Sequence, residues 1–468
     1  MTNLAGPAQQ QQTQPICALA GLPAYAEEKA PFSRFGVGAI KLACLLAILS
    51  MALGQAVQAQ TFTVLHTFTG APDGANPNNG VVIDRAGNLY GTTFGGGING
   101  NGCTAEGNET GCGTVFKLSK HGSGFVYSTL YKFQGPPDGN YPVGVVVGPD
   151  GTLYGTTAGG GTFNAACPQY ENGCGTAFRL RPPASICATP LCPWNENLLY
   201  SFTGNADGAN PQNGDLVFDG TGNIYGTTLR GGANTYGAAY ELTPSQGGYS
   251  QSVIYNSNPD SDGLGSPYSG LIIDPSGNLY GASSYSNDNI AGAVYRLTLS
   301  QSGWTANTLA SFQCIRWINP GCFPQALIFD STGNILGATS DGSFYDEGAV
   351  YDLRASDNWS LTVLHVFGMG QGVIENHLTM DAAGNIYGTG FICSNLYGCV
   401  FKLTPSGTGY VYSELYDFTD GLDGAHPHGP VAIDANGNLY GTAENGGFLD
   451  TCRGQGDDGC GVVWEITP

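Results

Sequence analysis

The stretch Asp84-Arg-Ala-Gly-Asn-Leu-Tyr-Gly91 decides the fold of this chain, because close variants of it recur along the sequence. Four further copies follow the pattern Asp-x-x-Gly-Asn-(Leu/Ile)-Tyr-Gly: Asp219–Gly226, Asp274–Gly281, Asp381–Gly388 and Asp434–Gly441. Two copies are imperfect, since Asp330–Gly337 has Leu336 in place of tyrosine and Gly148–Gly155 reads GPDGTLYG. Seven units spaced 51 to 71 residues apart in a turn-rich chain predict a β-propeller.

Each unit contains four segments with strand character. The first is a short apolar run, Val81–Ile83, joined to a second strand, Leu89–Thr93, by a turn in which Gly and Asn are expected to supply positive φ angles. The third strand alternates, as in Val115–Leu118, and the fourth is an aromatic run such as Leu130–Phe133. One position of the third strand varies in charge, which predicts a solvent-facing site without function; its occupants are Lys117, Arg179, Glu241, Arg296, Asp352, Lys402 and Glu465.

The order of the strands predicts how the ring closes. The chain enters with a fourth strand, 62–68, and leaves with a third, so strand 62–68 should pair with the C-terminal strands 430–466 and complete the last blade. The first strand of each unit, expected to be the most buried, should line the axis. We therefore expect an all-β, seven-bladed propeller of four-stranded blades, in a single domain over residues 60–468.

The composition excludes several classes of partner. Glycine and proline number 74 and 26 of 468 residues, and only 11% of residues are charged. Acidic residues outnumber basic ones 36 to 15, for a net charge of −21, which disfavours nucleic acid and anionic membranes. We expect no cofactor and a monomer whose partner is an extracellular ligand, with carbohydrate as one candidate.

The N-terminus has the layout of a secretory signal. In residues 1–59, Arg34 and Lys41 flank the apolar run Leu42–Leu53, and a small-residue site, Val57-Gln58-Ala59, follows. The long n-region is unusual, and the alternative is a retained membrane anchor, although the run is short for a span of about 20 residues. Cleavage after Ala59 predicts a secreted, periplasmic or cell-surface protein with no membrane span in the mature chain.

Twelve cysteines outside the signal fall into six neighbouring pairs. No CxxC motif supports zinc, so an exported chain predicts disulfides. The pairs are Cys103/Cys112, Cys167/Cys174, Cys187/Cys192, Cys314/Cys322, Cys393/Cys399 and Cys452/Cys460.

The connections between the fourth and first strands and between the second and third strands are long, and they should share one face that carries any binding site. An Asp-Gly-x-x-Pro segment recurs there with Asp73, Asp138, Asp207 and Asp423. These carboxylates have two interpretations. Calcium ligation is the weaker one, because a turn needed in every blade recurs whereas a single site should break the repeat. We expect no metal.

Departures from the repeat supply the site candidates. His377 aligns with Gly80, Gly144 and Gly270, and Asp215 occupies the same position in the third unit. Catalytic or acid–base candidates are His377, His426, His428, Glu375 and Asp423, and binding candidates are Arg316, Trp317 and Asp215. The alternative is a set of polar loop residues at a wet surface.

The unit consensus, carried by Leu199–Thr228 and Gly113–Leu118, resembles the GloVer-type tandem repeat family of secreted bacterial proteins. The resemblance implies a repeat propeller at or beyond the cell surface without an assigned activity, and the repeated unit is also similar to NHL and gluconolactonase-like propellers. The sequence contains no GxSxG, HExxH or P-loop motif. The first functional hypothesis is therefore a binding or scaffolding module for a surface polysaccharide or protein, and the alternative is a glycan hydrolase or lyase.

Overall fold

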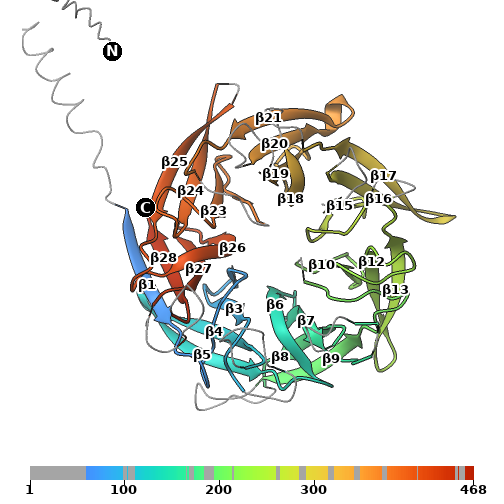
Figure 1. The fold of residues 1–468 in the computed structure, drawn as a ribbon, viewed down its shortest axis with the longest axis horizontal. Coiled ribbons are helices and arrows are strands. Elements are labelled where there is room, and N and C mark those ends of the chain that lie inside the picture. Colours follow the sequence, from blue (N-terminus) through green and yellow to red (C-terminus); the bar gives the residue numbers. More distant parts are fainter. Residues whose placement is uncertain are drawn as a thin grey trace, which may run out of the picture. The chain divides into compact units, whose positions relative to one another are not determined.

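The computed structural model describes residues 60–98, 103, 111–164, 166–167, 173–183, 194–212, 215–259, 264–283, 291–314, 321–341, 348–371, 377–407, 409–447, 452 and 459–468. Seven four-stranded antiparallel sheets follow one another around a central axis, as Figure 1 shows. The first strand of each blade lies nearest the axis and the fourth lies outermost. The predicted seven-bladed propeller is confirmed.

The strands of the seven blades have the following bounds. Blade 1 contains β2 (Val81–Ile83), β3 (Leu89–Thr93), β4 (Thr114–His121) and β5 (Gly124–Lys132). Blade 2 contains β6 (Gly139–Val147), β7 (Leu153–Gly160), β8 (Thr176–Arg181) and β9 (Asn195–Ser201). Blade 3 contains β10 (Val217–Phe218), β11 (Ile224–Thr228), β12 (Ala238–Ser245) and β13 (Gly248–Asn256). Blade 4 contains β14 (Ile272–Ile273), β15 (Leu279–Ser283), β16 (Ala293–Ser300) and β17 (Gly303–Ser311).

The remaining three blades repeat the same order. Blade 5 contains β18 (Cys322–Phe329), β19 (Ile335–Asp341), β20 (Ala349–Arg354) and β21 (Ser360–Val366), with a short 3-10 turn η2 (Ala355–Asp357) before β21. Blade 6 contains β22 (Thr379–Met380), β23 (Ile386–Gly390), β24 (Cys399–Ser406) and β25 (Gly409–Asp417). Blade 7 contains β26 (Ala425–Ile433), β27 (Leu439–Asn445), β28 (Val462–Thr467) and, as its outermost strand, β1 (Thr61–Thr67).

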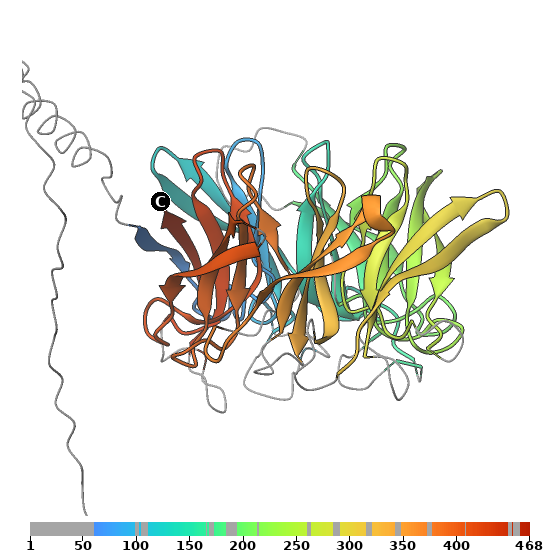
Figure 2. The same cartoon turned by 90° about the horizontal axis from the view of Figure 1, so that it is seen from above.

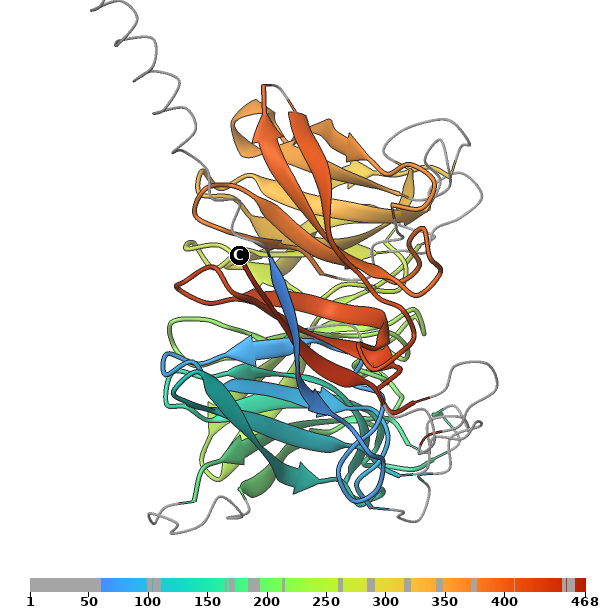
Figure 3. The same cartoon turned by 90° about the vertical axis from the view of Figure 1, so that its left-hand side faces the viewer.

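The ring is closed by the two ends of the propeller chain. Strand β1 pairs antiparallel with β28 from Thr61 opposite Thr467 to Thr67 opposite Val462. Figure 3 shows the blue β1 lying along the red strands of blade 7. The predicted closure therefore holds, and blade 7 is completed by strands from both ends of the propeller.

The Asp-x-x-Gly-Asn turn is organised by its aspartate. Asp84 Oδ1 accepts hydrogen bonds from the backbone N–H of Ala86 (2.8 Å) and Asn88 (2.9 Å), and Oδ2 accepts from Asn88 Nδ2 (2.8 Å) and the Tyr90 hydroxyl (3.0 Å). Gly87 adopts φ +82°, but Asn88 does not have a positive φ. The expectation that Asn supplies a positive φ is thus wrong: its side chain bonds the aspartate instead.

These aspartates make the stability of the protein depend on pH in the acidic range. Burial acts to raise their pKa values, but the hydrogen bonds from the turn outweigh it and hold the pKa below the ordinary value at Asp84, Asp219, Asp274, Asp330, Asp381 and Asp434. A lowered folded-state pKa stabilises the fold above the unfolded pKa of about 3.9, and the contribution is lost as the pH falls through the folded value.

We therefore expect Asp219→Asn to lower Tm at pH 6, and we expect the difference from the wild type to shrink as the pH falls through the lowered pKa of Asp219, because the wild-type carboxylate then becomes protonated. Thermal unfolding across pH 6 to 2 checks this, with Asp357→Asn as a matched control because Asp357 is exposed on η2. A difference in Tm that stays the same over the whole acid range would contradict the electrostatic origin.

The glycine that ends each repeat motif, such as Gly91 or Gly337, is required by an aromatic ring. In every blade this glycine lies directly opposite an aromatic residue of the third strand: Gly91/Phe116, Gly155/Phe178, Gly226/Tyr240, Gly281/Tyr295, Gly337/Tyr351, Gly388/Phe401 and Gly441/Trp464. Each ring covers its glycine so closely that a Cβ would collide with it. All seven rings are buried, so these pairs form the centre of each blade's core.

Neighbouring blades are joined by a recurring backbone latch. In five joints a residue with φ of 53° to 57° donates its N–H to a carbonyl of the preceding blade at 2.8 to 3.0 Å: Asn76 to Cys460, Tyr141 to Cys112, Asn210 to Cys174, Phe323 to Ala291 and His426 to Tyr397. The donors lie in connections between fourth and first strands or at the start of the first strand. The acceptors lie between second and third strands. The two sets of connections therefore meet on one face, as predicted; Figure 2 shows the hairpin turns on the opposite face.

Two details of the strands differ from expectation. The second strand, not the first, is the most buried: β3 is buried throughout, whereas β2 is half-buried after Val81, because the first strand has a sheet neighbour on one side only. The fourth strands begin earlier than predicted, β5 at Gly124, because the third and fourth strands form long hairpins.

The charged position of the third strand is also less exposed than predicted. In six blades its side chain lies across from the turn tyrosine of the second strand, and in blade 5 Asp352 lies across from Leu336. Lys117 Nζ lies 5.3 Å from the centre of the Tyr90 ring. Asp352 is only 6% exposed and pairs with Arg354 at 2.9 Å. The side chains at this position are half-buried or buried because the tyrosine ring and the neighbouring blade cover their stems.

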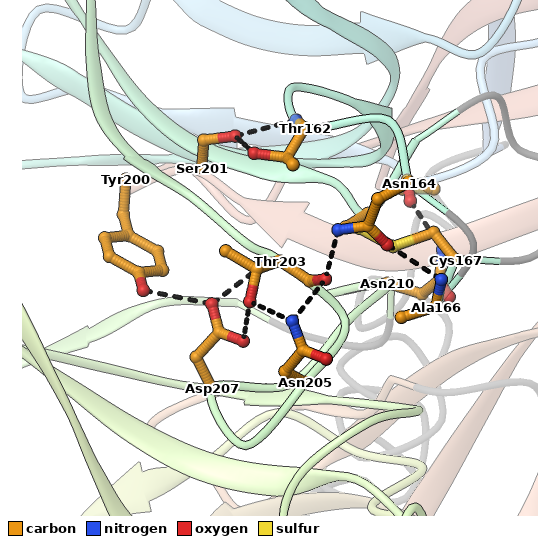
Figure 4. The surroundings of a disulfide bond; sticks show 12 residues. Thr162, Asn164, Ala166, Cys167, Tyr200, Ser201, Thr203, Asn205, Asp207 and Asn210 are labelled. Atoms are coloured by element: carbon orange, nitrogen blue, oxygen red, sulfur yellow. Dashed lines mark hydrogen bonds between the residues drawn. A yellow bond between two sulfur atoms is a disulfide. The ribbon is translucent and has the colours of Figure 1, made fainter.

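Five of the six predicted disulfides are present: Cys103–Cys112, Cys167–Cys174, Cys314–Cys322, Cys393–Cys399 and Cys452–Cys460. Cys187 and Cys192 lie outside the described residues. Cys112, Cys174 and Cys460 are also the latch acceptors, so these bridges brace the joints between blades. In blade 2, Asn164 Nδ2, within the same loop as Cys167, donates to the Thr203 carbonyl of the turn leading to blade 3 (2.8 Å; Figure 4). Among the described residues, none forms a helix long and apolar enough to cross a membrane.

Candidate functional site

The four Asp-Gly-x-x-Pro aspartates serve their own turns. Asp207 accepts hydrogen bonds from the Tyr200 hydroxyl (3.0 Å), the Thr203 N–H (2.8 Å) and the Thr203 hydroxyl (2.6 Å), as Figure 4 shows. Asp138 and Asp423 accept from Tyr131 and Tyr416 in the same way, each at 3.0 Å.

In blade 7's outermost strand His66 replaces the tyrosine, and its Nε2 lies 3.1 Å from the Asp73 carboxylate. A calcium ion would have to displace these donors, so the arrangement favours the turn interpretation for all four aspartates.

His426 is a packing residue. It is 7% exposed, its ring stacks on Phe391 with centroids 4.5 Å apart, and its Nδ1 lies 3.3 Å from Asn445 Oδ1. Tyr141 occupies the same latch position and stacks on Phe94 at 4.6 Å. The ring of His426 therefore fills a blade joint, and the Asp423 carboxylate accepts hydrogen bonds from Tyr416 and Thr419.

Asp215 and His377 come together across the axis. Asp215 lies just before β10 of blade 3, and His377 lies just before β22 of blade 6, so they belong to nearly opposite blades (Figure 1). His377 Nε2 and Asp215 Oδ2 are 3.8 Å apart, and the two side chains are 19% and 39% exposed. The alignment of the two residues predicted a shared position at the axis, and the structure brings their side chains together.

His428 is a neighbour of this pair, but the nitrogen and oxygen atoms of the three side chains do not all lie within 4.8 Å of one another. It lies on β26, the inner strand of blade 7, and its ring packs edge-on to Phe391 at 5.4 Å. Burial lowers the pKa of His377; the Asp215 carboxylate opposes this shift and His428 adds to it, so His428 is close enough to act electrostatically. We call Asp215, His377 and His428 the axial site. Glu375, Arg316 and Trp317 lie outside the described residues.

The repeat alignment shows how the positions of Asp215 and His377 differ from the same position in the other units. The positions equivalent to Asp215 and His377 are occupied by Gly80, Gly144, Gly270, Ala326 and Pro430 in the other units. At Gly80 the neighbouring blade's Pro430 leaves no room for a side chain. The fold therefore does not need a side chain here, and the two ionisable ones face each other.

Sequence reasoning did not identify a second candidate site, which contains Glu196. A cavity of about 470 Å³ at the boundary of blades 1 and 2 is lined by Tyr131, Gln134, Pro136, Pro137, Asp138, Glu196 and Leu198, with Gly135. Burial, followed by the nearby Asp138, raises the pKa of Glu196 to about 7. Glu196 lies opposite Leu180, the place that Tyr127 takes opposite Leu118 in blade 1. Comparison of the fourth strands would have shown this replacement of an aromatic residue by a carboxylate.

A third group lies on blade 6. Side-chain atoms of Cys399, Glu414 and Asp417 lie within 4.8 Å of one another. Burial, a hydrogen bond that the protonated Glu414 donates to Asp417, and the charge of Asp417 raise the pKa of Glu414 to about 7. Cys399 is bonded to Cys393, so its sulfur is not a thiolate and the group is not a metal centre in the oxidised protein.

The fold and its loop-face cluster define a seven-bladed repeat propeller with a polar axial site. The chain belongs to the Gloeobacter/Verrucomicrobia repeat family, whose model matches residues 54–189, 102–321, 167–392 and 319–468. No curated protein sequence matches the chain.

Solved structures with a similar fold are distant in sequence. An ulvan lyase of a new polysaccharide lyase family, solved with a bound saccharide, is 12% identical, with a TM-score of 0.50 over 85% of this chain and 95% of that chain. A gluconolactonase from Xanthomonas campestris is 13% identical, with a TM-score of 0.35 over 58% and 75% of the two chains. PorZ, a surface component of the type-IX secretion system of Porphyromonas gingivalis, is 13% identical, with a TM-score of 0.48 over 86% of this chain and 47% of PorZ. At these identities the likeness shows the fold alone.

Proposed function

We propose that the protein is an exported binding module that holds its ligand at the axial site. The observation that carries the proposal is the approach of His377 to Asp215 from nearly opposite blades, to 3.8 Å, at an aligned position where the other units have glycine, alanine or proline. A rigid ring that presents a few convergent polar groups on its loop face is the usual form of a ligand site on such a scaffold.

The ligand best suited to these groups is a neutral glycan. A carboxylate accepts and an imidazole both donates and accepts hydrogen bonds, which matches the paired hydroxyl groups of a sugar. The net charge of −21 repels polyanions, so an uncharged saccharide is favoured over an acidic one. The ulvan lyase propeller was solved with a saccharide of glucuronic acid and sulfated rhamnose, so it is a precedent for a glycan on this fold, although for an acidic one.

Export is part of the proposal. Residues 1–59 act as a signal that is cleaved after Ala59, which leaves the propeller, residues 60–468, as a monomer in the periplasm, at the cell surface or outside the cell. The five disulfides support an oxidising compartment, because such bonds are reduced in the cytosol of most organisms.

A glycan-binding screen with residues 60–468 tests the proposal. We expect binding of a neutral oligosaccharide, weakened at least about 10-fold by His377→Ala and by Asp215→Asn, since each removes hydrogen bonds to the ligand. His121→Ala is the matched control, because His121 lies at the end of β4 on the hairpin face. Binding that is unchanged in both axial variants would overturn the assignment of the site.

The same screen separates binding from catalysis. Chromatography of the oligosaccharide after incubation reports whether it is cleaved. An intact saccharide is the result expected for a binding module, whereas cleavage products that disappear with His377→Ala would establish the hydrolase or lyase alternative instead.

A further inference from the structure

We infer that the cavity between blades 1 and 2 is a second binding site, which takes the guanidinium group of an arginine side chain from a partner polypeptide. The cavity measures about 470 Å³ and is lined by the outermost strands β5 and β9 and by the connection between β5 and β6. It lies at the rim of the ring and not at its axis (Figure 1), so the inference does not depend on the proposed glycan.

The cavity occupies a place that an aromatic ring fills in other joints between blades. Three joints stack a ring of one outermost strand on a ring of the next, with the planes within 10° of parallel: His66/Tyr127, His365/Tyr412 and Tyr416/Phe62. In the joint between blades 1 and 2, the same two positions of the strands are held by Tyr131 and Glu196. Among the described residues, Tyr131 contacts Phe133 edge-on and has no stacked ring. The carboxylate at position 196 therefore leaves a flat aromatic face without its partner.

Glu196 brings an unsatisfied acceptor into this space. Its Oε1 is buried and has no hydrogen-bond partner in the part of the chain that the structure describes. The neighbouring Asp138 differs, because it accepts hydrogen bonds from the Tyr131 hydroxyl (3.0 Å) and from the N–H groups of Gln134 (2.9 Å) and Gly139 (2.8 Å). A buried acceptor without a donor is costly, so a ligand that donates to Glu196 is favoured.

The charges of the lining select a cation. The cavity is lined by two carboxylates, Asp138 and Glu196, and by no lysine or arginine. Burial and the nearby Asp138 raise the pKa of Glu196 to about 7, and a positive charge in the cavity would offset both effects. The net charge of −21 also attracts basic segments of other proteins.

Among cations, a guanidinium group fits the shape and the donors best. It is planar, it stacks on aromatic rings, and its N–H groups bind carboxylates in their own plane. It can therefore lie over Tyr131 where the other joints have a ring, and donate to Glu196. The apolar stem of an arginine would lie against Pro137 and Leu198, the second of which is 46% exposed at the outer surface.

An NMR titration of residues 60–468 with N-acetyl-arginine amide at pH 8, where Glu196 is ionised, tests the inference. We expect saturable binding of one molecule per chain. N-acetyl-citrulline amide has the same shape without the charge and should bind at least about 10-fold more weakly. N-acetyl-lysine amide should also bind more weakly, because an ammonium group cannot stack on Tyr131 as a flat guanidinium does. Free arginine should bind more weakly than the blocked form, since its α-carboxylate is repelled by Asp138.

Variants of the lining locate the bound probe. Glu196→Gln should weaken binding of N-acetyl-arginine amide at least about 10-fold, because it keeps the shape and removes the charge. Glu414→Gln is the matched control: Glu414 is also on an outermost strand, β25, and its pKa is also raised to about 7. His377→Ala should leave this binding unchanged, which separates the cavity from the axial site.

Glu196→Tyr tests the use of the space. We expect the new ring to stack on Tyr131 as in the three other joints, which raises Tm and abolishes binding of the probe. A Tm below that of the wild type would contradict the correspondence between this cavity and the ring pairs.

Four results would overturn the inference: no saturable binding of N-acetyl-arginine amide by the wild type, equal binding of the citrulline or lysine probe, tighter binding of free arginine, or unchanged binding in Glu196→Gln. A neutral oligosaccharide whose binding is lost in Glu196→Gln and kept in His377→Ala would assign the cavity to a glycan and overturn it as well. Loss of glycan binding in His377→Ala alone bears only on the proposed function.

Discussion

A chain that begins at Thr69 and therefore lacks β1 is expected to lose its folded monomer. Strand β1 forms the outermost strand of blade 7, and Phe68, which follows it, is completely buried and donates its N–H to the Gly461 carbonyl at 3.0 Å. Loss of a buried phenylalanine alone costs about 3–5 kcal/mol, and a whole domain is stable by only about 5–15 kcal/mol.

The effect is large because β1 contacts three blades. Within blade 7 it pairs with β28; Phe62 stacks on Tyr416 of blade 6 at 3.7 Å, and His66 stacks on Tyr127 of blade 1 at 3.8 Å. Figure 3 shows β1 in this position. Removing it exposes the edge of β28 and frees the joints on both sides, so strand exchange between molecules becomes a further outcome.

Circular dichroism and size-exclusion chromatography of chains beginning at Gln60 and at Thr69 measure this effect. The longer chain is the control, because it lacks only residues 1–59. We also expect a synthetic peptide of residues 60–70 to restore the thermal transition of the shorter chain in proportion to its concentration. A shorter chain that stays monomeric with the Tm of the longer one would show that β1 does not close the ring.

Gly91→Ala is expected to destabilise the protein by about 1–3 kcal/mol, although alanine is otherwise well tolerated in a buried strand. A Cβ at Gly91 would lie 2.5 Å from Phe116 Cζ and 3.0 Å from the Gly80 carbonyl oxygen. The ring is completely buried and the carbonyl is backbone, so neither can move without disturbing the first blade.

Urea unfolding of Gly91→Ala and of Gly220→Ala checks this prediction. Gly220 is the matched control, because a Cβ added there would have no atom of the described residues within 4 Å and its φ is not positive. The double variant Gly91→Ala with Phe116→Leu should be less destabilised than the sum of the two single changes, since the smaller side chain makes room for the new methyl group. Strict additivity of the two changes would contradict a collision between ring and glycine.

Much of the fold follows from the repeat alone. The spacing of the Asp84–Gly91 unit and its relatives predicts seven blades, and counting the fourth strands predicts closure by the N-terminal strand. The sequence was enough here because the turn is formed by short-range interactions: Asp84 accepts hydrogen bonds from residues up to six positions away, and Gly87 supplies the positive φ. The pairing of Gly91 with Phe116 could not be predicted as a collision, because it depends on the register between two strands.

The candidate site was predictable in part. Repeat alignment placed Asp215 and His377 at one position, but grouped them with His426 and Asp423, whose roles in a blade joint and a turn depend on Phe391 and Tyr416. Sequence by itself therefore determined the number of blades, their turns and their closure, since these rest on local bonds repeated seven times. Only the tertiary structure decided that blades 3 and 6 face each other across the axis, because that distance is set by the closed ring and by no single unit.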